Sequence, residues 1–196
     1  MPSQPFQPPL FDTMNILKLL QQAIVTGAML LAAPTFAHAA APANAAPLGL
    51  EIGKATTADV ARLAPKPERT GTNRYSGGAQ WQTDGSEAGL EGLKRVDYLF
   101  DRSNVLVAVE MTFSKNPKGM MKLFSGKYKL VSNKVDDFMN YGSARYEKGD
   151  TYIDINAPHM SFDMTVTYAT KALMKSFKQT VSDTEQEKKN KAQQAL

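Results

Sequence analysis

The sequence predicts an α+β fold, an antiparallel sheet with about three helices on one face. Apolar and polar residues alternate in three long segments, 96–100, 105–113 and 162–168. Such alternation is typical of strands that bury one side and expose the other. Helix start signals, each a polar capping residue followed by an apolar stripe, occur at three other places in the chain. Because an apolar stripe has to be buried against another element, we expect the helices to pack on the sheet.

The first helix is expected to begin after Thr56. Thr56 and Asp59 have the spacing of a capping box, in which each side chain satisfies a free backbone N–H at the start of a helix. Val60 and Leu63 then form an apolar stripe. Pro65 ends the helix, since proline removes a backbone donor and clashes with the preceding turn.

Two shorter strands are expected on either side of this helix. Leucine and isoleucine alternate with other residues over 48–52, and a strand within 69–84 is weakened by the glycines at 77–78. Tyr75 and Trp81 are an even number of residues apart, so we expect them on one face of that strand. They are candidates for a ligand-stacking surface, although a lone Trp in a small domain is more often part of the core.

Antiparallel hairpins account for most of the remaining strands. The first joins 95–101 to 105–113 through the turn Asp-Arg-Ser-Asn, and the second turns at Lys148-Gly149-Asp150. The buried face of the segment 105–113 is expected to carry Val105, Val107, Val109, Met111 and Phe113. One face of the last strand is expected to carry Phe162, Met164, Val166 and Tyr168.

Two further helices are expected. Asn116 and Pro117 are a favourable cap and first residue for a helix that ends at Gly126. Thr170 is expected to cap a final helix whose apolar stripe ends at Val181. The apolar residues nearly vanish after that position, so we expect 182–196 to be a polar, solvated tail that frays.

An internal sequence similarity suggests that the fold contains two similar units. The sequence MTF at 111–113 precedes MMKLF at 120–124, and VTY at 166–168 precedes LMKSF at 173–177. In each case an alternating strand leads into a helix with a Met-Lys-x-Phe stripe. We therefore expect a domain over 48–181 built from two repeated helix-on-sheet units, 48–113 and 114–181.

The first 39 residues are expected to be a cleaved export signal. The strongly apolar part, 23–33, is preceded by Lys18 and is shorter than the roughly 20 residues that span a bilayer. Small residues favour cleavage after Ala39, with Ala45 as a second candidate, and an anchor that is never cut is the alternative. Met14 would make an ordinary signal start, so translation is expected to begin either there or at Met1.

The residue composition limits the chemistry. The chain contains no cysteine, which excludes disulfides, thiolate metal sites and a lipid-modified cysteine. Together with the export signal, this predicts a soluble periplasmic protein that an ordinary core stabilises. We expect a flexible Ala/Pro segment over 40–47 ahead of the domain. We also expect the mature chain not to span a membrane.

The net charge of +4 does not indicate nucleic-acid binding, because the polar tail carries most of the excess. A local cluster of lysines does lie between Glu110 and Asp136: Lys115, Lys118, Lys122, Lys127, Lys129 and Lys134. Lys118 and Lys122 are its candidate binding residues for an anionic lipid surface or an acidic partner. The simpler interpretation is a solvated helix face.

His159 is the one histidine that remains after the predicted cleavage. Asp154 and Asp163 are close in sequence, so His159 could carry a proton or bind a metal ion with a carboxylate orienting it. A loop histidine between two strands is the simpler interpretation. One His, no Cys and scattered acids make a poor ligand set, so we expect no metal, no cofactor and no catalytic residue.

A short stretch resembles a known group of exported proteins. The segment GKATTADVARLAP, 53–65, resembles the first helix of small exported α+β modules, with Gly53, Thr56, Val60 and Leu63 as matching positions. These modules include the outer-membrane assembly lipoprotein BamE and the β-lactamase-inhibitor-protein-like domains. The chain lacks the lipid-acceptor cysteine that BamE requires. The resemblance implies a helix-on-sheet module that binds other proteins through its exposed sheet face.

These expectations favour a non-enzymatic protein-binding module of the cell envelope. The alternative is a periplasmic hydrolase or small-ligand-binding protein with His159 in its site. An open, mildly apolar sheet face with exposed aromatic residues would indicate a binder. A deep pocket that contains His159 beside a carboxylate would indicate an enzyme.

Overall fold

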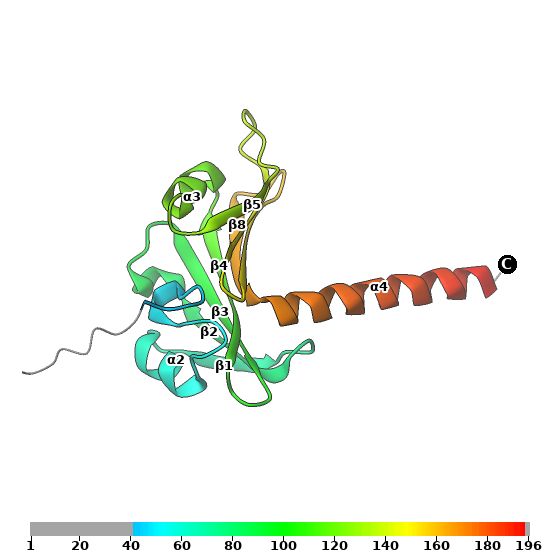
Figure 1. Cartoon of the computed structure of the whole chain (residues 1–196), viewed down its shortest axis with the longest axis horizontal. Helices are drawn as coiled ribbons and strands as arrows, with labels where there is room; N and C mark the ends of the chain where they lie inside the picture. Colours follow the sequence, from blue (N-terminus) through cyan, green and yellow to red (C-terminus); the bar gives the residue numbers. More distant parts are fainter. Residues whose placement is uncertain (1–40, 195–196) are drawn as a thin grey trace, which may run out of the picture. The chain divides into compact units, whose positions relative to one another are not determined.

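The α+β class and the antiparallel sheet are confirmed. A computed structural model describes residues 41–194, and these contain one eight-stranded antiparallel sheet with three α-helices (Figure 1). The strands are β1 (Glu68–Thr72), β2 (Gly77–Asp84), β3 (Leu93–Asp101), β4 (Leu106–Ser114), β5 (Lys129–Asn133), β6 (Gly142–Lys148), β7 (Thr151–Ala157) and β8 (Asp163–Thr170). The helices are α2 (Thr57–Leu63), α3 (Pro117–Phe124) and α4 (Lys171–Gln194).

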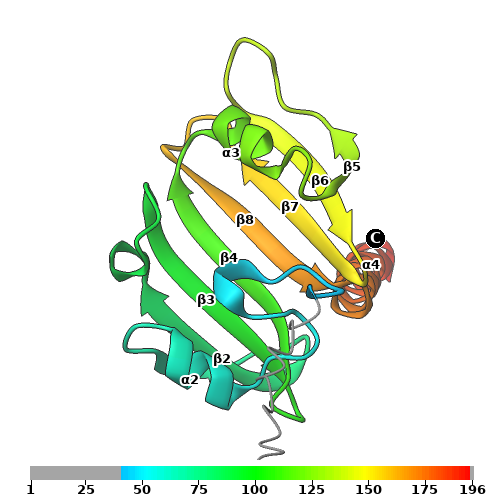
Figure 2. The same ribbon diagram turned by 60° about the vertical axis from the view of Figure 1, so that its left-hand side comes forward.

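The strand order is β1-β2-β3-β4-β8-β7-β6-β5, so each half of the sheet is a meander of four consecutive strands (Figure 2). The two meanders meet where β4 pairs antiparallel with β8. Met111 faces Val166 in that pairing, and the internal sequence similarity aligns these same two residues with each other. A short helix precedes each meander, α2 before β1 and α3 before β5. The expected repeat units themselves stay a prediction.

Alternation along the strands produces the core. The buried side chains of β3, β4, β7 and β8 include Tyr98, Phe100, Val109, Met111, Ile153, Ile155, Met164 and Val166. Val60 of α2 and Phe124 of α3 pack into this core, and both helices lie over the same face of the sheet (Figure 2). The long helix α4 instead projects from the end of β8 on the other side of the sheet (Figure 1). Two of the three helices therefore share one face.

The capping signals of all three helices are confirmed. The backbone N–H of Asp59 donates to the Thr56 hydroxyl, and the Thr56 N–H donates to the Asp59 carboxylate at 3.0 Å. The Asn116 side chain accepts the N–H of Gly119 at 3.0 Å. Thr170 accepts the N–H of Leu173 at 3.2 Å. Beyond its cap, α4 continues to Gln194 as an exposed helix, where we expected a fraying tail after 181.

The prediction of a strand over 48–52 was wrong. A single 3-10 turn, η1 (Pro47–Gly49), occupies its start, and Leu48 has a φ of 53°. Leu50 and Ile52 are still buried, because they pack into the core as part of an irregular segment. The residues before them are also ordered, since Ala45 is completely buried. The segment expected to be a flexible linker is therefore part of the fold from Asn44 onward.

The single strand expected within 69–84 is in fact a hairpin, β1 and β2, whose turn contains Tyr75.

A second difference from the prediction lies in β4, where the pairing with β3 shifts register between Leu99 and Phe100. The shift turns Leu106 into the core and leaves Val107 half-buried, so the predicted alternation holds only from Val109 onward. The last strand, β8, begins at Asp163, so Phe162 lies in the loop before it and is exposed.

The predicted export signal, the alternative start at Met14 and the cut after Ala39 lie outside the described residues. The second candidate cut, after Ala45, falls within them. None of the helices between residues 41 and 194 is long and apolar enough to cross a membrane.

Candidate binding groove

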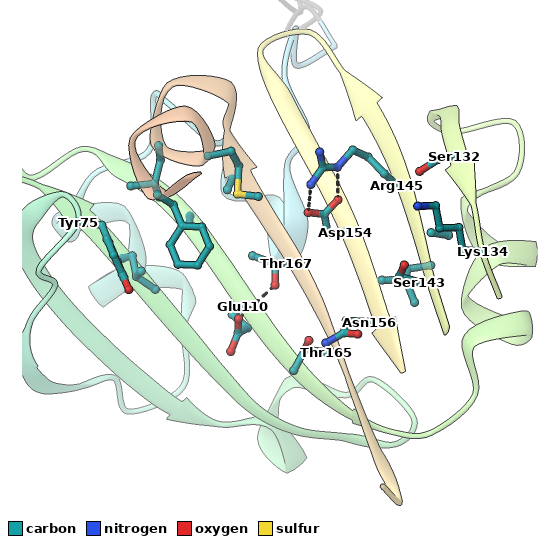
Figure 3. Close-up of a pocket in the computed structure, with 18 of the residues that line it drawn as sticks. Tyr75, Glu110, Ser132, Lys134, Ser143, Arg145, Asp154, Asn156, Thr165 and Thr167 are labelled. Atoms are coloured by element: carbon teal, nitrogen blue, oxygen red, sulfur yellow. Dashed lines mark hydrogen bonds and ion pairs between the residues drawn. The ribbon is translucent and has the colours of Figure 1, made fainter. Parts of the chain in front are cut away.

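The sheet face that α2 and α3 leave uncovered carries a groove of about 670 Å³ (Figure 3). Its floor consists of the side chains that alternate with the core residues, so they point to the opposite face. They come from β3, β4, β8, β7 and β6, with Ser132 and Lys134 at the β5 edge. The groove therefore crosses the junction of the two meanders.

An ion pair forms the centre of one wall. Arg145 of β6 and Asp154 of β7 are directly opposite each other in the strand register. Nε and Nη2 of Arg145 each donate to a different carboxylate oxygen of Asp154, both at 2.6 Å, and each side chain is 25% exposed (Figure 3). The hydrogen bonds to Asp154 raise the pKa of Arg145. The guanidinium also lies 4.8 Å from the ring centre of Tyr152, which adds a cation–π contact.

Hydrogen-bonding groups line the middle of the groove. Thr167 of β8 donates to the Glu110 carboxylate of β4 at 3.2 Å. Thr165, Asn156 and Ser143 continue this polar surface toward the β5 edge (Figure 3). Their hydroxyl and amide groups can both donate and accept hydrogen bonds, which suits a backbone or another polar ligand.

The other end of the groove is apolar. The first turns of α4 contribute Leu173, Met174 and Phe177 to the lining. Phe177 packs edge-to-face on Tyr75, with ring centres 5.0 Å apart. Arg74 lies 4.6 Å from the ring centre of the same tyrosine. The groove thus offers an apolar, aromatic end and a charged end to one ligand.

The sequence-predicted candidates are not gathered in this groove. Tyr75 lines it, but Trp81 lies on the core side of β2, edge-to-face on Phe100 with ring centres 5.4 Å apart. The two residues do not share a face, because Tyr75 is in the turn before the strand. The indole Nε1 of Trp81 is buried with no hydrogen-bond partner among the described residues.

The other candidates lie on the surface. His159 is exposed in the turn between β7 and β8, where its ring packs on Tyr141 with centres 4.9 Å apart. It does not line the groove. Lys118 and Lys122 are on α3, and Lys118 contacts the Asp137 carbonyl. Residues 41–194 contain no group of three His, Cys, Asp or Glu side chains placed to hold a metal ion.

Sequence reasoning missed Arg145, Asp154, Glu110 and Lys134 as groove residues. A signal for the ion pair was available, because the predicted turn at Lys148-Gly149-Asp150 fixes the hairpin register. That register places Arg145 opposite Asp154 on the face that alternates with the core. Glu110 and Lys134 had no such signal, since their position depends on pairing between distant segments.

Comparison of the chain with known protein families, with curated proteins and with solved structures found no match.

Proposed function

We propose that this chain is an exported protein of the cell envelope that binds another protein through its uncovered sheet face. The observation that carries the proposal is the groove between the polar strand residues and the start of α4. It combines an exposed aromatic end with a bidentate ion pair and a row of hydrogen-bonding side chains. Protein interfaces characteristically combine an apolar, aromatic part with a polar surround.

The sequence supports the proposed location. The short apolar segment with small residues after it supports export, and the absence of cysteine removes any dependence on disulfides. The resemblance of 53–65 to exported helix-on-sheet modules supports the same use of the open sheet face. BamE itself is not the model for its role, since the lipid-acceptor cysteine is missing.

A small-ligand carrier is the second candidate, and the size of the groove favours it. About 670 Å³ lies within the range of roughly 300–1,000 Å³ that small-molecule sites occupy. Such a ligand would place an apolar part against Phe177 and polar groups near Arg145. This version does not use His159.

A groove-filling substitution tests both candidates. Thr165→Arg places a long side chain in the middle of the groove, and Ser125→Arg adds the same charge at the exposed end of α3 as a control. The tagged chain and both variants are used to capture proteins from the envelope fraction of the source cells. We expect a partner that wild type and Ser125→Arg retain and that Thr165→Arg loses.

Native mass spectrometry of the purified chain separates the two candidates. A bound molecule of small mass that Thr165→Arg removes would favour the carrier. Equal capture by all three proteins would contradict binding through the groove. Recovery of the chain from the cytosol with residues 1–39 intact would contradict its proposed location.

A further inference from the structure

Four large apolar side chains are exposed to solvent at one end of the sheet, three of them almost fully. Phe138 is 93% exposed, Phe162 92%, Met160 91% and Met139 63%. Isolated apolar residues are normal on protein surfaces, but a group of this size at one place marks an interaction site. We call these four residues the apolar tip.

The apolar tip comes from two neighbouring loops. The loop between β5 and β6 carries Phe138 and Met139, and the loop between β7 and β8 carries Met160 and Phe162. Gly142 pairs with Ala157 where the two loops leave the sheet. The contact between Tyr141 and His159, at 4.9 Å between ring centres, joins the loops directly. The four side chains therefore belong to one end of the molecule.

Hydrogen bonds hold both loops in conformations that expose these side chains. The Asp136 carboxylate accepts the N–H groups of Phe138 and Met139 at 2.8 and 2.7 Å. Those backbone bonds lower the pKa of Asp136. In the second loop, Ser161 accepts the N–H of Asp163 at 3.0 Å and donates to its carbonyl at 2.9 Å. The loops are thus folded with their apolar groups directed outward.

Lysines surround the apolar tip. Lys115 donates to the Pro158 carbonyl at 2.5 Å, and its own N–H donates to the carbonyl of Phe162 at 2.9 Å. Lys118 contacts the carbonyl of Asp137, and α3 lies at this end of the sheet (Figure 2). Among the described residues, the lysines near the tip that form no ion pair are Lys115, Lys118, Lys122 and Lys134, and the charge of Lys118 helps to lower the pKa of Asp136.

The acidic residues at this end do not cancel that charge. Asp163 is paired with Lys94 at 2.5 Å, so this pair is neutral. The first loop contributes two acidic residues, Asp136 and Asp137, which is fewer than the four lysines. The surface beside the tip therefore has a positive balance, which complements a negatively charged surface.

The β5–β6 loop extends beyond the strands that carry it (Figure 1). A protein partner would need a surface shaped to fit these outward-pointing side chains. A lipid layer accepts them without any matching shape, because the apolar groups enter the acyl region while the lysines stay at the headgroups. We propose that the apolar tip inserts into the surface layer of a membrane that contains anionic lipid. Apart from Lys134, this contact uses none of the residues that line the groove.

Vesicle co-sedimentation tests the proposal. The chain is mixed with phosphatidylcholine vesicles and with vesicles that also contain phosphatidylglycerol, at low and at high salt. The tip variant is Phe138→Ser with Phe162→Ser, and the control is Leu63→Ser with Leu130→Ser, two half-exposed residues elsewhere on the surface. We expect wild type to bind anionic vesicles most tightly at low salt. The tip variant should bind at least about tenfold more weakly, and the control within about twofold of wild type.

Two results would overturn the proposal: no binding of wild type to anionic vesicles at low salt, or equal binding by wild type and the tip variant. Sedimentation velocity tests the alternative that the apolar tip binds a second copy of this chain. If wild type forms a dimer that the tip variant abolishes, and neither binds vesicles, the apolar tip is a contact between copies of this chain. Thermal unfolding of both variants checks that they are folded, which we expect since all four substituted residues are exposed.

Discussion

The backbone N–H of Asp150 donates to Oδ1 of Asn44 at 2.8 Å, although 106 residues separate the two along the chain. The same side chain donates through Nδ2 to the Ile52 carbonyl at 3.0 Å. Asn44 thus attaches the start of the described chain to the turn between β6 and β7. Gly149 makes the approach possible, because a Cβ there would lie 2.4 Å from Oδ1 of Asn44.

Asn44→Ala should lower the free energy of unfolding by about 1–2 kcal/mol, since both hydrogen bonds are lost and the facing backbone groups lose a partner. Urea denaturation followed by circular dichroism measures the change. Asn156→Ala is the matched control, because that exposed side chain makes no hydrogen bond within residues 41–194, and we expect a change below about 0.5 kcal/mol. Equal effects of the two substitutions would contradict the role of Asn44.

The first helix gives a prediction about pH. Backbone and side-chain hydrogen bonds from Thr56 lower the pKa of Asp59 below its unfolded value of about 3.8, and Arg62 adds to the effect. A lowered pKa in the folded state means that this carboxylate stabilises the fold above about pH 4. The contribution is lost as the pH falls through the lowered pKa.

We therefore expect Asp59→Asn to reduce the urea midpoint at pH 7, with a difference from wild type that shrinks below about pH 4. Arg62→Gln is the comparison that separates the cap from the ion pair. It should keep most of the pH dependence, because Thr56 makes the larger contribution. A constant difference between wild type and Asp59→Asn from pH 7 to pH 2 would show that the carboxylate charge plays no part in the cap.

Local signals accounted for much of the fold. The caps at Thr56, Asn116 and Thr170 and the alternation in β3 and β8 depend on residues close in sequence, so they could be recognised there. The edge strand β5 could not, because all five of its residues are exposed and no buried face leaves a pattern. The segment 48–52 misled the prediction, since its alternating residues are buried by an irregular chain.

The groove was harder to predict than the fold. It depends on β4 lying beside β8, a pairing of residues that are 49 to 61 positions apart in the sequence. That pairing brings Glu110 next to Thr167, and neither residue is unusual in its own strand. Trp81 shows the reverse. It is the only Trp of the chain and stood out as a binding candidate, but its side chain packs against the core. Position on the outer face was a better guide to the groove than residue type.

Tyr98 yields a prediction about the core. It is completely buried, and its hydroxyl has no hydrogen-bond partner among the described residues. Burial raises its pKa to about 12. Tyr98→Phe removes a polar group that gains nothing from burial, so it should leave stability unchanged or raise it by up to about 1 kcal/mol.

Tyr168→Phe is the matched comparison, since Tyr168 is also buried, and burial raises its pKa with the Tyr128 side chain adding to the shift. We expect this variant to be about 1 kcal/mol less stable than wild type. Guanidinium denaturation measures both changes. A loss of more than about 1 kcal/mol in Tyr98→Phe would mean that its hydroxyl is hydrogen-bonded in solution.

The contact between Tyr75 and Phe177 fixes the start of α4 over the groove. Edge-to-face pairs contribute about 0.5–1.5 kcal/mol beyond their buried area, so a double-mutant cycle of Tyr75→Leu and Phe177→Leu should give a coupling energy in that range. Hydrogen exchange should show faster exchange in the first turns of α4 in either variant, with β7 unchanged. A coupling near zero would mean that the two rings do not hold the helix.

The ion pair in the groove wall should be strongly coupled as well. Arg145 and Asp154 form two charge-assisted hydrogen bonds with 25% of each side chain exposed, so solvent screens them only in part. We expect Arg145→Met and Asp154→Asn each to cost about 1–3 kcal/mol, because each leaves the partner without its counter-charge. The double variant should be more stable than the sum of the single losses predicts, by about 1–2 kcal/mol.

The control cycle uses the ion pair of Lys129 and Glu147, which lie 2.8 Å apart between β5 and β6. The lysine of this pair is 77% exposed. Its coupling should fall below about 1 kcal/mol and weaken further in high salt. If the two cycles give equal coupling, the position of Arg145 and Asp154 in the groove adds nothing to their interaction, and the wall is then ordinary solvated surface.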